Sequence, residues 1–211
     1  ERLRAEIGLD LDGLLPDIIE PGTVIGTVRP EAADIVGPDG KPTPVIAVGS
    51  HDTASAVVSV PATDPNFAYV SCGTWSLVGL ELDEPVLTEA SRTANFTNEL
   101  GVDHTVRYLK NVMGLWVLNE AVRAWHDQGL EIALPEADAA AAAAEPLRTV
   151  VDINDASFYS PGDMAARIDE AAHATGQPCP RDIGEYIRCI NDSLALAYRR
   201  AVRQAVELSG R

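Results

Sequence analysis

The chain has 211 residues, of which 16 are Lys or Arg and 32 are Asp or Glu, so its formal net charge is −16. An acidic surface repels nucleic-acid phosphates and anionic lipids, so we expect neither a nucleic-acid partner nor a membrane partner. The sequence also contains no run of the roughly 20 apolar residues that a membrane-spanning helix needs.

Three cysteines, at positions 72, 179 and 189, are too few and too scattered for a disulfide scaffold, which favours a reducing, cytoplasmic location. The cysteines and the four histidines have none of the spacings typical of zinc sites, so we expect no metal ligand in the chain. The sequence begins with Glu1 rather than Met. We therefore expect it to be part of a longer protein, with the missing remainder of the chain as a partner.

The first 44 residues predict little regular structure. Residues 1–8 are typical of the end of a helix that Gly8 closes, and residues 23–28 are typical of a short strand. Five of the nine residues 36–44 are Gly or Pro, which indicates a linker. We therefore assign residues 1–44 to the tail of one domain and residues 45–211 to a second domain.

The second domain opens with three strand signals and one helix signal. Residues 45–48 are continuously apolar and predict a buried, interior strand, and the small apolar residues 53–60 predict a closely packed helix. Residues 67–72 and 77–82 predict two strands, which the turn at 73–76 joins into a hairpin.

Three helices are predicted further along the chain. Apolar residues at three- and four-residue spacing predict a helix over 111–128, and an alanine-rich segment predicts a solvated helix over 137–144. A long apolar stripe predicts a helix over 182–208, while the polar residues 152–163 are expected to form a loop. The mixture of strands and helices indicates the α/β class.

Asp52 has two interpretations. It follows the predicted strand at 45–48 and precedes the predicted helix, where α/β proteins place ligand chemistry, so its carboxylate would serve as a general base. A helix N-cap, in which the carboxylate accepts a hydrogen bond from a free amide, explains the same position. The pattern alone favours the cap.

Two further segments carry polar groups at structured positions. The turn at Gly73 and Thr74 would offer amides and a hydroxyl to a phosphate, and an ordinary hairpin turn with Trp75 packed on the sheet is the alternative. Asn111 opens the predicted helix and would cap it, and Asn119 follows two turns later, so both would lie on one side of that helix.

Five segments resemble the FGGY carbohydrate kinases, in the form that acts on L-rhamnulose. They are residues 47–56 (AVGSHDTASA), 69–79 (YVSCGTWSLVG), 84–99, which end in NFTNE, 109–116 (LKNVMGLW) and 158–168. These segments occur in the order of the family and extend over nearly the whole chain.

The resemblance implies a two-domain kinase with an actin-like, ribonuclease-H-like core, in which sugar and ATP meet between the domains. This chain would hold the end of the first domain and much of the second, as a mixed sheet flanked by helices. The implied reaction transfers the γ-phosphate of ATP to the 1-hydroxyl of L-rhamnulose, and Mg²⁺ would offset the repulsion between ATP and an acidic protein.

The resemblance also assigns residues on the sugar side of the site. Asp52 would be the proton acceptor, and His51 and Thr53 would share in binding the sugar. Asn111 would hydrogen-bond the sugar as well.

On the nucleotide side, the resemblance implies that Thr74 and the neighbouring Gly73 contact the ATP phosphates. Asn119 matches a nucleotide-contacting position at which relatives carry Gln, so its shorter amide departs from the family pattern.

Two motifs of the family are absent from the sequence: the first phosphate hairpin and the Gly-rich adenosine segment. We therefore expect that the chain by itself does not turn over. Two alternatives stay open, namely another FGGY kinase that acts on fuculose or xylulose, and a non-catalytic sugar-binding domain of the same fold.

Overall fold

The computed structural model describes residues 6, 8, 14, 16–33, 35–49 and 51–211, and the chain divides into two compact units, Glu1–Val58 and Ser59–Arg211. Apart from residues 6 and 8, the helix end predicted at 1–8 lies outside the described residues. No helix in the described part of the chain is both long and apolar enough to cross a membrane. The division into kinase domains at 44/45 stays a prediction.

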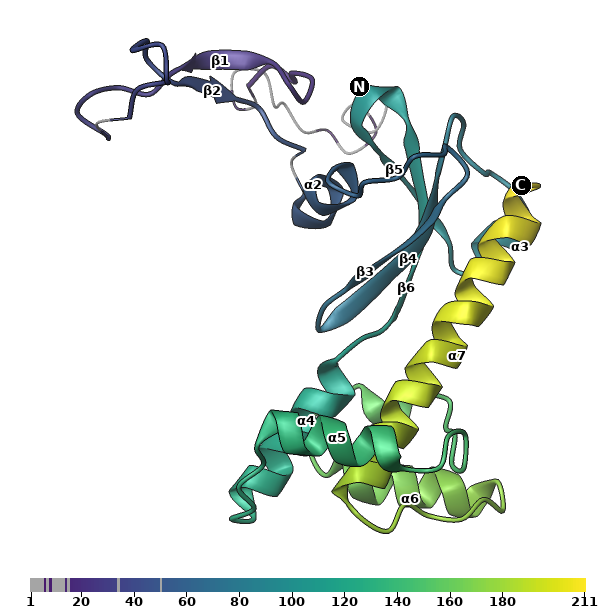
Figure 1. Cartoon of the computed structure of the whole chain (residues 1–211). Coiled ribbons are helices and arrows are strands. Elements are labelled where there is room, and N and C mark those ends of the chain that lie inside the picture. The colour runs from purple at the N-terminus through teal and green to yellow at the C-terminus, as the bar shows by residue number, and fades with distance from the viewer. Residues whose placement is uncertain (1–5, 7, 9–13, 15, 34, 50) are drawn as a thin grey trace. The chain divides into compact units, whose positions relative to one another are not determined.

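The first unit contains a two-stranded antiparallel sheet (Figure 1). Strand β1 (Val24–Thr27) pairs with strand β2 (Pro44–Ile46), which confirms the strand predicted at 23–28. Most of the predicted linker at 36–44 lies in the connection between these two strands.

The prediction of a buried, interior strand at 45–48 is wrong. β2 ends at Ile46, and Val45, Ile46 and Val48 are 36%, 50% and 73% exposed. Among the described strands, β2 pairs with β1 alone. A continuous apolar run looks the same in a sequence whether or not another layer covers it, so the pattern could not decide burial.

Helix α2 (Asp52–Val58) confirms the helix predicted at 53–60. Its buried residues, Ala54 and Val57, are three positions apart and therefore lie on one face. Ser55 Oγ donates a hydrogen bond of 2.9 Å to the carbonyl of Gly49, which ties the helix to the segment before it.

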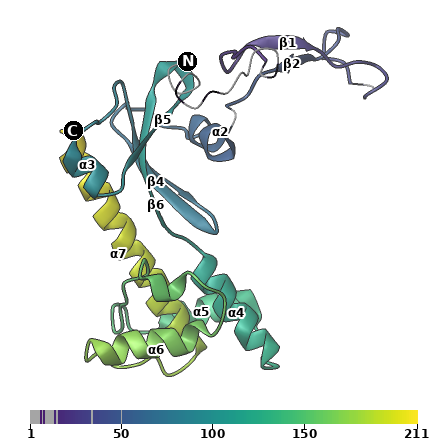
Figure 2. The same ribbon diagram turned by 180° about the vertical axis from the view of Figure 1, so that it is seen from behind.

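The second unit is built on a four-stranded sheet in the order β3-β4-β6-β5 (Figures 1 and 2). Its strands are β3 (Ala68–Cys72), β4 (Trp75–Leu82), β5 (Thr97–Leu100) and β6 (Val106–Met113). The hairpin predicted from residues 67–82 is confirmed, with Cys72 opposite Ser76 beside the turn. All pairings in this sheet are antiparallel, so the expectation of a mixed sheet is not met among the described strands.

The prediction of one helix over 111–128 is wrong in its first part. Asn111 lies in β6, opposite Leu77 of β4, and helix α4 (Trp116–Asp127) begins only after a turn. The prediction counted Val112 and Leu115 as part of the apolar stripe of one helix. In the structure Val112 is buried in the sheet and Leu115 precedes the helix. A strand followed by a helix can therefore show the apolar spacing of a single longer helix.

Helix α7 (Ile183–Ser209) confirms the helix predicted at 182–208 and runs along one face of the sheet (Figure 1). Asp182 caps it by accepting a hydrogen bond of 2.9 Å from the amide of Glu185, and Gly210 ends it in the left-handed conformation at φ 73°. One buried cluster between sheet and helix consists of Val78, Val112 and Ala201. Helices packed on a sheet confirm the α/β class.

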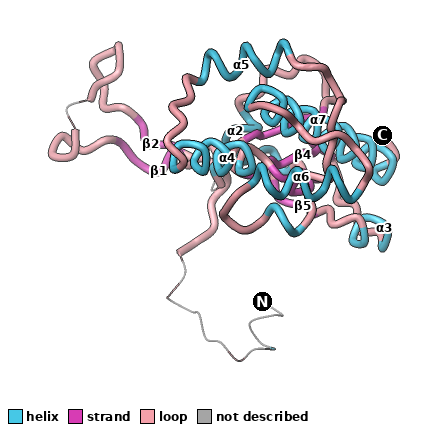
Figure 3. Tube along the Cα trace, turned by 90° about the horizontal axis from the view of Figure 1, so that it is seen from below, coloured by secondary structure: helices cyan, strands magenta, loops and turns pink. Residues whose placement is uncertain are grey.

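The first half of α7 packs with three other helices (Figure 3): α4, α5 (Leu134–Ala143) and α6 (Met164–Ala174). α5 confirms the helix predicted at 137–144 but is not fully solvated, because Ala137 and Ala141 are buried. The predicted loop at 152–163 includes the short helix η2 (Ala156–Phe158). The short helices α3 (Glu89–Thr93) and η1 (Val102–His104), like β5 and α6, have no counterpart in the sequence analysis.

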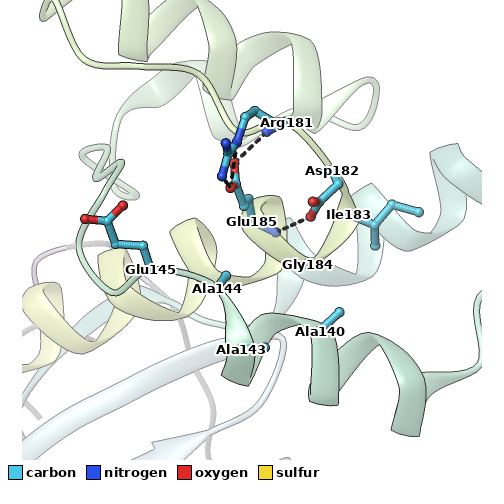
Figure 4. Close-up of a pocket in the computed structure, with 9 residues that line it drawn as sticks. All are labelled: Ala140, Ala143, Ala144, Glu145, Arg181, Asp182, Ile183, Gly184 and Glu185. Carbon is cyan, nitrogen blue, oxygen red and sulfur yellow. Dashed lines mark hydrogen bonds and ion pairs between the residues drawn. The ribbon is translucent and has the colours of Figure 1, made fainter.

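The start of α7 borders a cavity of about 660 Å³ beside α5, and Figure 4 shows the charged side chains there. Glu185 is only 9% exposed. Its carboxylate accepts two hydrogen bonds of 2.8 Å from Arg181, one from Nε and one from the backbone amide of that residue. It also accepts one of 3.3 Å from Nη1 of Arg148. These contacts, the hydrogen bond from the Arg181 side chain above all, lower the pKa of Glu185 to about 2.

This low pKa predicts that Glu185 makes the fold acid-sensitive. The folded pKa of about 2 lies below the ordinary 4.5, so the carboxylate stabilises the fold fully above pH 4.5, and this stabilisation is lost as the pH falls through about 2. Glu185→Gln should therefore lower Tm at pH 7 and flatten the fall of Tm between these two pH values. Glu207→Gln, at the exposed far end of α7, is the control. An equally steep fall in both variants would contradict the prediction.

Candidate active site

The predicted base lies at the beginning of α2, in the first unit. Asp52 is the first helical residue, and its side chain is 91% exposed. Its Oδ1 accepts a hydrogen bond of 2.7 Å from the amide of Thr53 and lies 3.4 Å from Nε2 of His51. The first helical hydrogen bond runs from the amide of Ser55 to the carbonyl of His51, so His51 holds the cap position instead of Asp52.

His51 and Thr53 contact each other as well as Asp52. Oγ1 of Thr53 lies 2.8 Å from Nδ1 of His51, within hydrogen-bonding distance. The three side chains thus form one small polar group with a solvent-accessible carboxylate. Such a group can bind the hydroxyls of a polyol and accept a proton from one of them.

The predicted phosphate turn joins β3 to β4 in the second unit. Gly73 and Thr74 are exposed, and the amide of Gly73 donates a hydrogen bond of 3.0 Å to the carbonyl of Trp75. The carbonyls of Gly73 and Thr74 accept hydrogen bonds of 2.8 and 3.1 Å from the amides of Leu115 and Trp116. The turn is therefore fixed on the first residues of α4.

Gly114, which the sequence analysis did not assign to the site, makes this contact possible. A Cβ at Gly114 would lie 2.7 Å from the carbonyl oxygen of Thr74 and 2.8 Å from the carbonyl carbon of Trp75. Only glycine allows the turn to approach so closely. The available sequence signal was a glycine directly after an apolar run, which is too common to identify a contact with a distant turn.

Tyr198, a residue of α7, contacts the two strands that flank the turn. The hydroxyl of Tyr198 lies 2.7 Å from Oγ of Ser76 and 3.5 Å from Sγ of Cys72. Burial raises the pKa of Tyr198 to about 12, so its hydroxyl stays neutral at physiological pH. Beside the turn, the rings of Trp75 and Tyr159 meet edge to face at 5.6 Å. The backbone that carries the Thr74 hydroxyl is therefore fixed by contacts with both α4 and α7.

The two asparagines lie on different elements, so the prediction that they share one helix is wrong. Asn111 is exposed on β6, whereas Asn119 is exposed on α4. The amide of Asn119 donates a hydrogen bond of 2.8 Å to the carbonyl of Leu115, whose own amide binds the carbonyl of Gly73. Asn119 therefore lies in the first turn of α4, at the end of the helix whose amides bind the Gly73–Thr74 turn.

The described residues contain no group of three or more His, Cys, Asp or Glu side chains that could hold a metal ion. Mg²⁺ that arrives with a nucleotide needs only one or two protein carboxylates, because phosphates and water supply the other ligands.

Comparison with known proteins gives one family and several close relatives. Residues 68–211 match the FGGY family of carbohydrate kinases, C-terminal domain. A rhamnulokinase of Bacteroides thetaiotaomicron is 46% identical over 191 residues, which are 90% of this chain and 38% of that protein. A rhamnulokinase of Klebsiella pneumoniae strain 342 is 42% identical over 90% of this chain and 37% of its own length. A rhamnulokinase of Enterococcus faecalis is 35% identical over 97% of this chain and 40% of its own length.

Among solved structures, the crystal structure of xylulose kinase from Rhodospirillum rubrum has a TM-score of 0.58 at 17% identity. The match covers 92% of this chain and 38% of that one. At this identity the likeness shows the fold alone. The chain thus spans about 37 to 40% of the length of each of these four proteins.

Proposed function

Because the chain belongs to the FGGY family of carbohydrate kinases, we propose that the complete gene product transfers the γ-phosphate of ATP to the 1-hydroxyl of L-rhamnulose. The observation that carries this proposal is the identity of 35 to 46% with three proteins named rhamnulokinase, over at least 90% of the chain. The proposal assigns residues 1–44 to the tail of the N-terminal kinase domain and its linker, and residues 45–211 to part of the C-terminal kinase domain. It also includes a cytoplasmic location.

In the proposed mechanism Asp52 is the proton acceptor. Phosphoryl transfer needs positioning, charge stabilisation and a group that takes the proton of the attacking hydroxyl. The exposed carboxylate of Asp52 meets the last requirement. His51 and Thr53, which lie within hydrogen-bonding distance of each other, bind neighbouring sugar hydroxyls and thereby orient the 1-hydroxyl. Asn111 contributes a further hydrogen bond to the sugar.

On the nucleotide side, Thr74 and Gly73 bind ATP phosphates and Asn119 contacts the nucleotide. The support for this assignment is the fixed turn, whose carbonyls are bound by the first amides of α4, so that its hydroxyl is held in place before ATP arrives. Mg²⁺ bound to ATP supplies positive charge to the transferring phosphoryl group.

Thr74→Val should raise the KM for ATP more than the KM for the sugar. Valine keeps the branched shape and therefore the turn, but it removes the hydroxyl, and loss of one hydrogen bond to a charged group costs about tenfold in binding. The measurement is steady-state kinetics of the complete gene product with each substrate varied. Thr97→Val, on the more distant strand β5, is the control, and a larger rise in the sugar KM would contradict the assignment.

The substrate proposal is tested by a kinase assay of the complete gene product with L-rhamnulose, L-fuculose and D-xylulose at equal concentrations. The expected kcat/KM is highest for L-rhamnulose by about tenfold or more, because mismatched hydroxyls leave polar groups of the site unpaired. A higher value for fuculose or xylulose would assign a different sugar within the family. Saturable sugar binding without ATP turnover would indicate a non-catalytic sugar-binding domain.

A further inference from the structure

A polar cavity of about 620 Å³ lies beside the outer edge of β6, and residues of β6, α7 and the segments at 93–95 and 150–154 line it. One of the lining residues is Asn111, which the proposed function assigns to the sugar, so the cavity adjoins the candidate active site. β5 pairs with β6 only as far as Thr97, opposite Leu109. Asn95, just before β5, has a left-handed φ of 61°. From Lys110 onward, the edge of β6 therefore borders the cavity instead of another strand.

Two cations from different elements line this cavity, Lys110 of β6 and Arg200 of α7. Nζ of Lys110 donates a hydrogen bond of 3.4 Å to Oε1 of Gln204 and lies 5.5 Å from the centre of the Phe96 ring. None of the ion pairs in the described part of the chain includes Lys110 or Arg200. Burial and the charge of Arg200 lower the pKa of Lys110.

Most other cations of the second unit have carboxylate partners. Such pairs include Arg107 with Glu99 at 2.7 Å, Arg123 with Glu120 at 2.6 Å and Arg188 with Asp192 at 2.9 Å. Arg167, Arg199 and Arg203 are in no ion pair of the described residues either, but they do not line this cavity. What distinguishes Lys110 and Arg200 is that the two cations share one cavity.

The remaining lining of the cavity also suits an anion. Among the lining residues, Asp152 alone carries a carboxylate, and its Oδ1 already accepts a hydrogen bond of 3.1 Å from the amide of Asn154. Oδ1 of Asn154 accepts a hydrogen bond of 2.8 Å from the amide of Met113, which leaves the side-chain NH₂ of Asn154 as a donor. Lys110 is half-buried, whereas Arg200 is exposed at the rim. A half-buried cation without a carboxylate partner is stabilised by a counter-charge from a ligand.

We propose that this cavity binds a small phosphate-bearing metabolite, with Lys110 and Arg200 holding its phosphate group. Two cations match the charge of a phosphate dianion better than that of a single carboxylate. The volume lies within the range of small-molecule sites, so the cavity also accommodates the part of the ligand that carries the phosphate. Asn95, Asn154 and Gln204, which share the lining, provide hydrogen-bonding groups for that part.

The test is an NMR titration of the ¹⁵N-labelled 211-residue chain with inorganic phosphate, with sodium acetate at matched ionic strength as the carboxylate arm. We expect saturable shifts of the amides of Asn95, Lys110 and Asn154 with phosphate and weaker shifts with acetate. Arg200→Gln and Lys110→Met should each raise the Kd for phosphate by about tenfold, the value of one charge-assisted hydrogen bond. Unchanged Tm values establish that both variants fold.

Arg199→Gln is the matched control, because it removes the same charge from the neighbouring position of α7 without lining the cavity. It should change the Kd by less than about twofold, as expected for an exposed charge outside the site. Shifts that do not saturate, equal responses to phosphate and acetate, or an equal loss in Arg199→Gln would each overturn the proposal, because each indicates general attraction of counter-ions.

Discussion

Replacing Asp52 by Asn is expected to lower the kcat of the complete gene product by about 10²- to 10⁴-fold, the usual contribution of a positioned general base. Asn has the same size, and its side-chain oxygen can still accept the hydrogen bond that the amide of Thr53 donates to Asp52 at 2.7 Å. It cannot take a proton at neutral pH. The chemical step should therefore slow while the KM for the sugar changes little.

A purely structural role of Asp52 predicts a different result. Asn would keep the hydrogen bond from the amide of Thr53 and lose only an exposed charge in the first turn of α2, so Tm would change little and kcat would be retained. Asp64→Asn is the matched control, because Oδ1 of Asp64 likewise accepts a local backbone hydrogen bond of 2.7 Å, from Asn66, and has no assigned role in the site. A kcat for Asp52→Asn within a factor of about three of wild type would exclude Asp52 as the base.

The elements that the sequence predicted correctly have strong local signals. The hairpin of β3 and β4 has two apolar runs on either side of a glycine turn, and α7 has both a cap at Asp182 and a terminal Gly210. These signals need no information from elsewhere in the chain. The short helix α2 follows the same rule, since small residues after Gly49 favour close packing.

The errors arose where long-range contacts decide the structure. β6 is a strand because it pairs with both β4 and β5, and no local pattern at Asn111 distinguishes it from the start of a helix. Ala137 and Ala141 are buried because α5 packs in the helical core with α7, which an alanine-rich sequence does not reveal. β2 is apolar but exposed for the same reason, since burial depends on neighbours.

The candidate site shows the same division. Gly73, Thr74 and Asp52 were identified because short segments around them resemble a family. Gly114 and the amides of Leu115 and Trp116, which hold the turn, were missed because their role exists only once β6 and α4 place them against Gly73. The sequence therefore indicates which groups carry the chemistry, and the fold determines which groups support them.

Gly114→Ala is expected to have the largest effect on stability, because the turn leaves no room for a methyl group. The new Cβ would lie 2.7 Å from the carbonyl oxygen of Thr74 and 2.8 Å from the carbonyl carbon of Trp75. Both are backbone atoms, and relief requires the turn to move away from Leu115 and Trp116, whose amides bind it at 2.8 and 3.1 Å. Overpacking of this kind costs about 3 kcal/mol.

For a unit of this size, that cost corresponds to a fall in Tm of roughly 6 to 12 °C, measured by thermal unfolding of the complete gene product. In material that stays folded, the KM for ATP should rise, because displacement of the turn moves the Thr74 hydroxyl. Gly73→Ala is the control for stability, since a Cβ there meets its nearest neighbour, the carbonyl oxygen of Trp75, at an ordinary 3.4 Å. Its Tm should fall by much less. If the two variants unfold at the same temperature, the close approach at Gly114 does not hold the turn, and the rigid support of Thr74 must be sought in the contacts of Tyr198 instead.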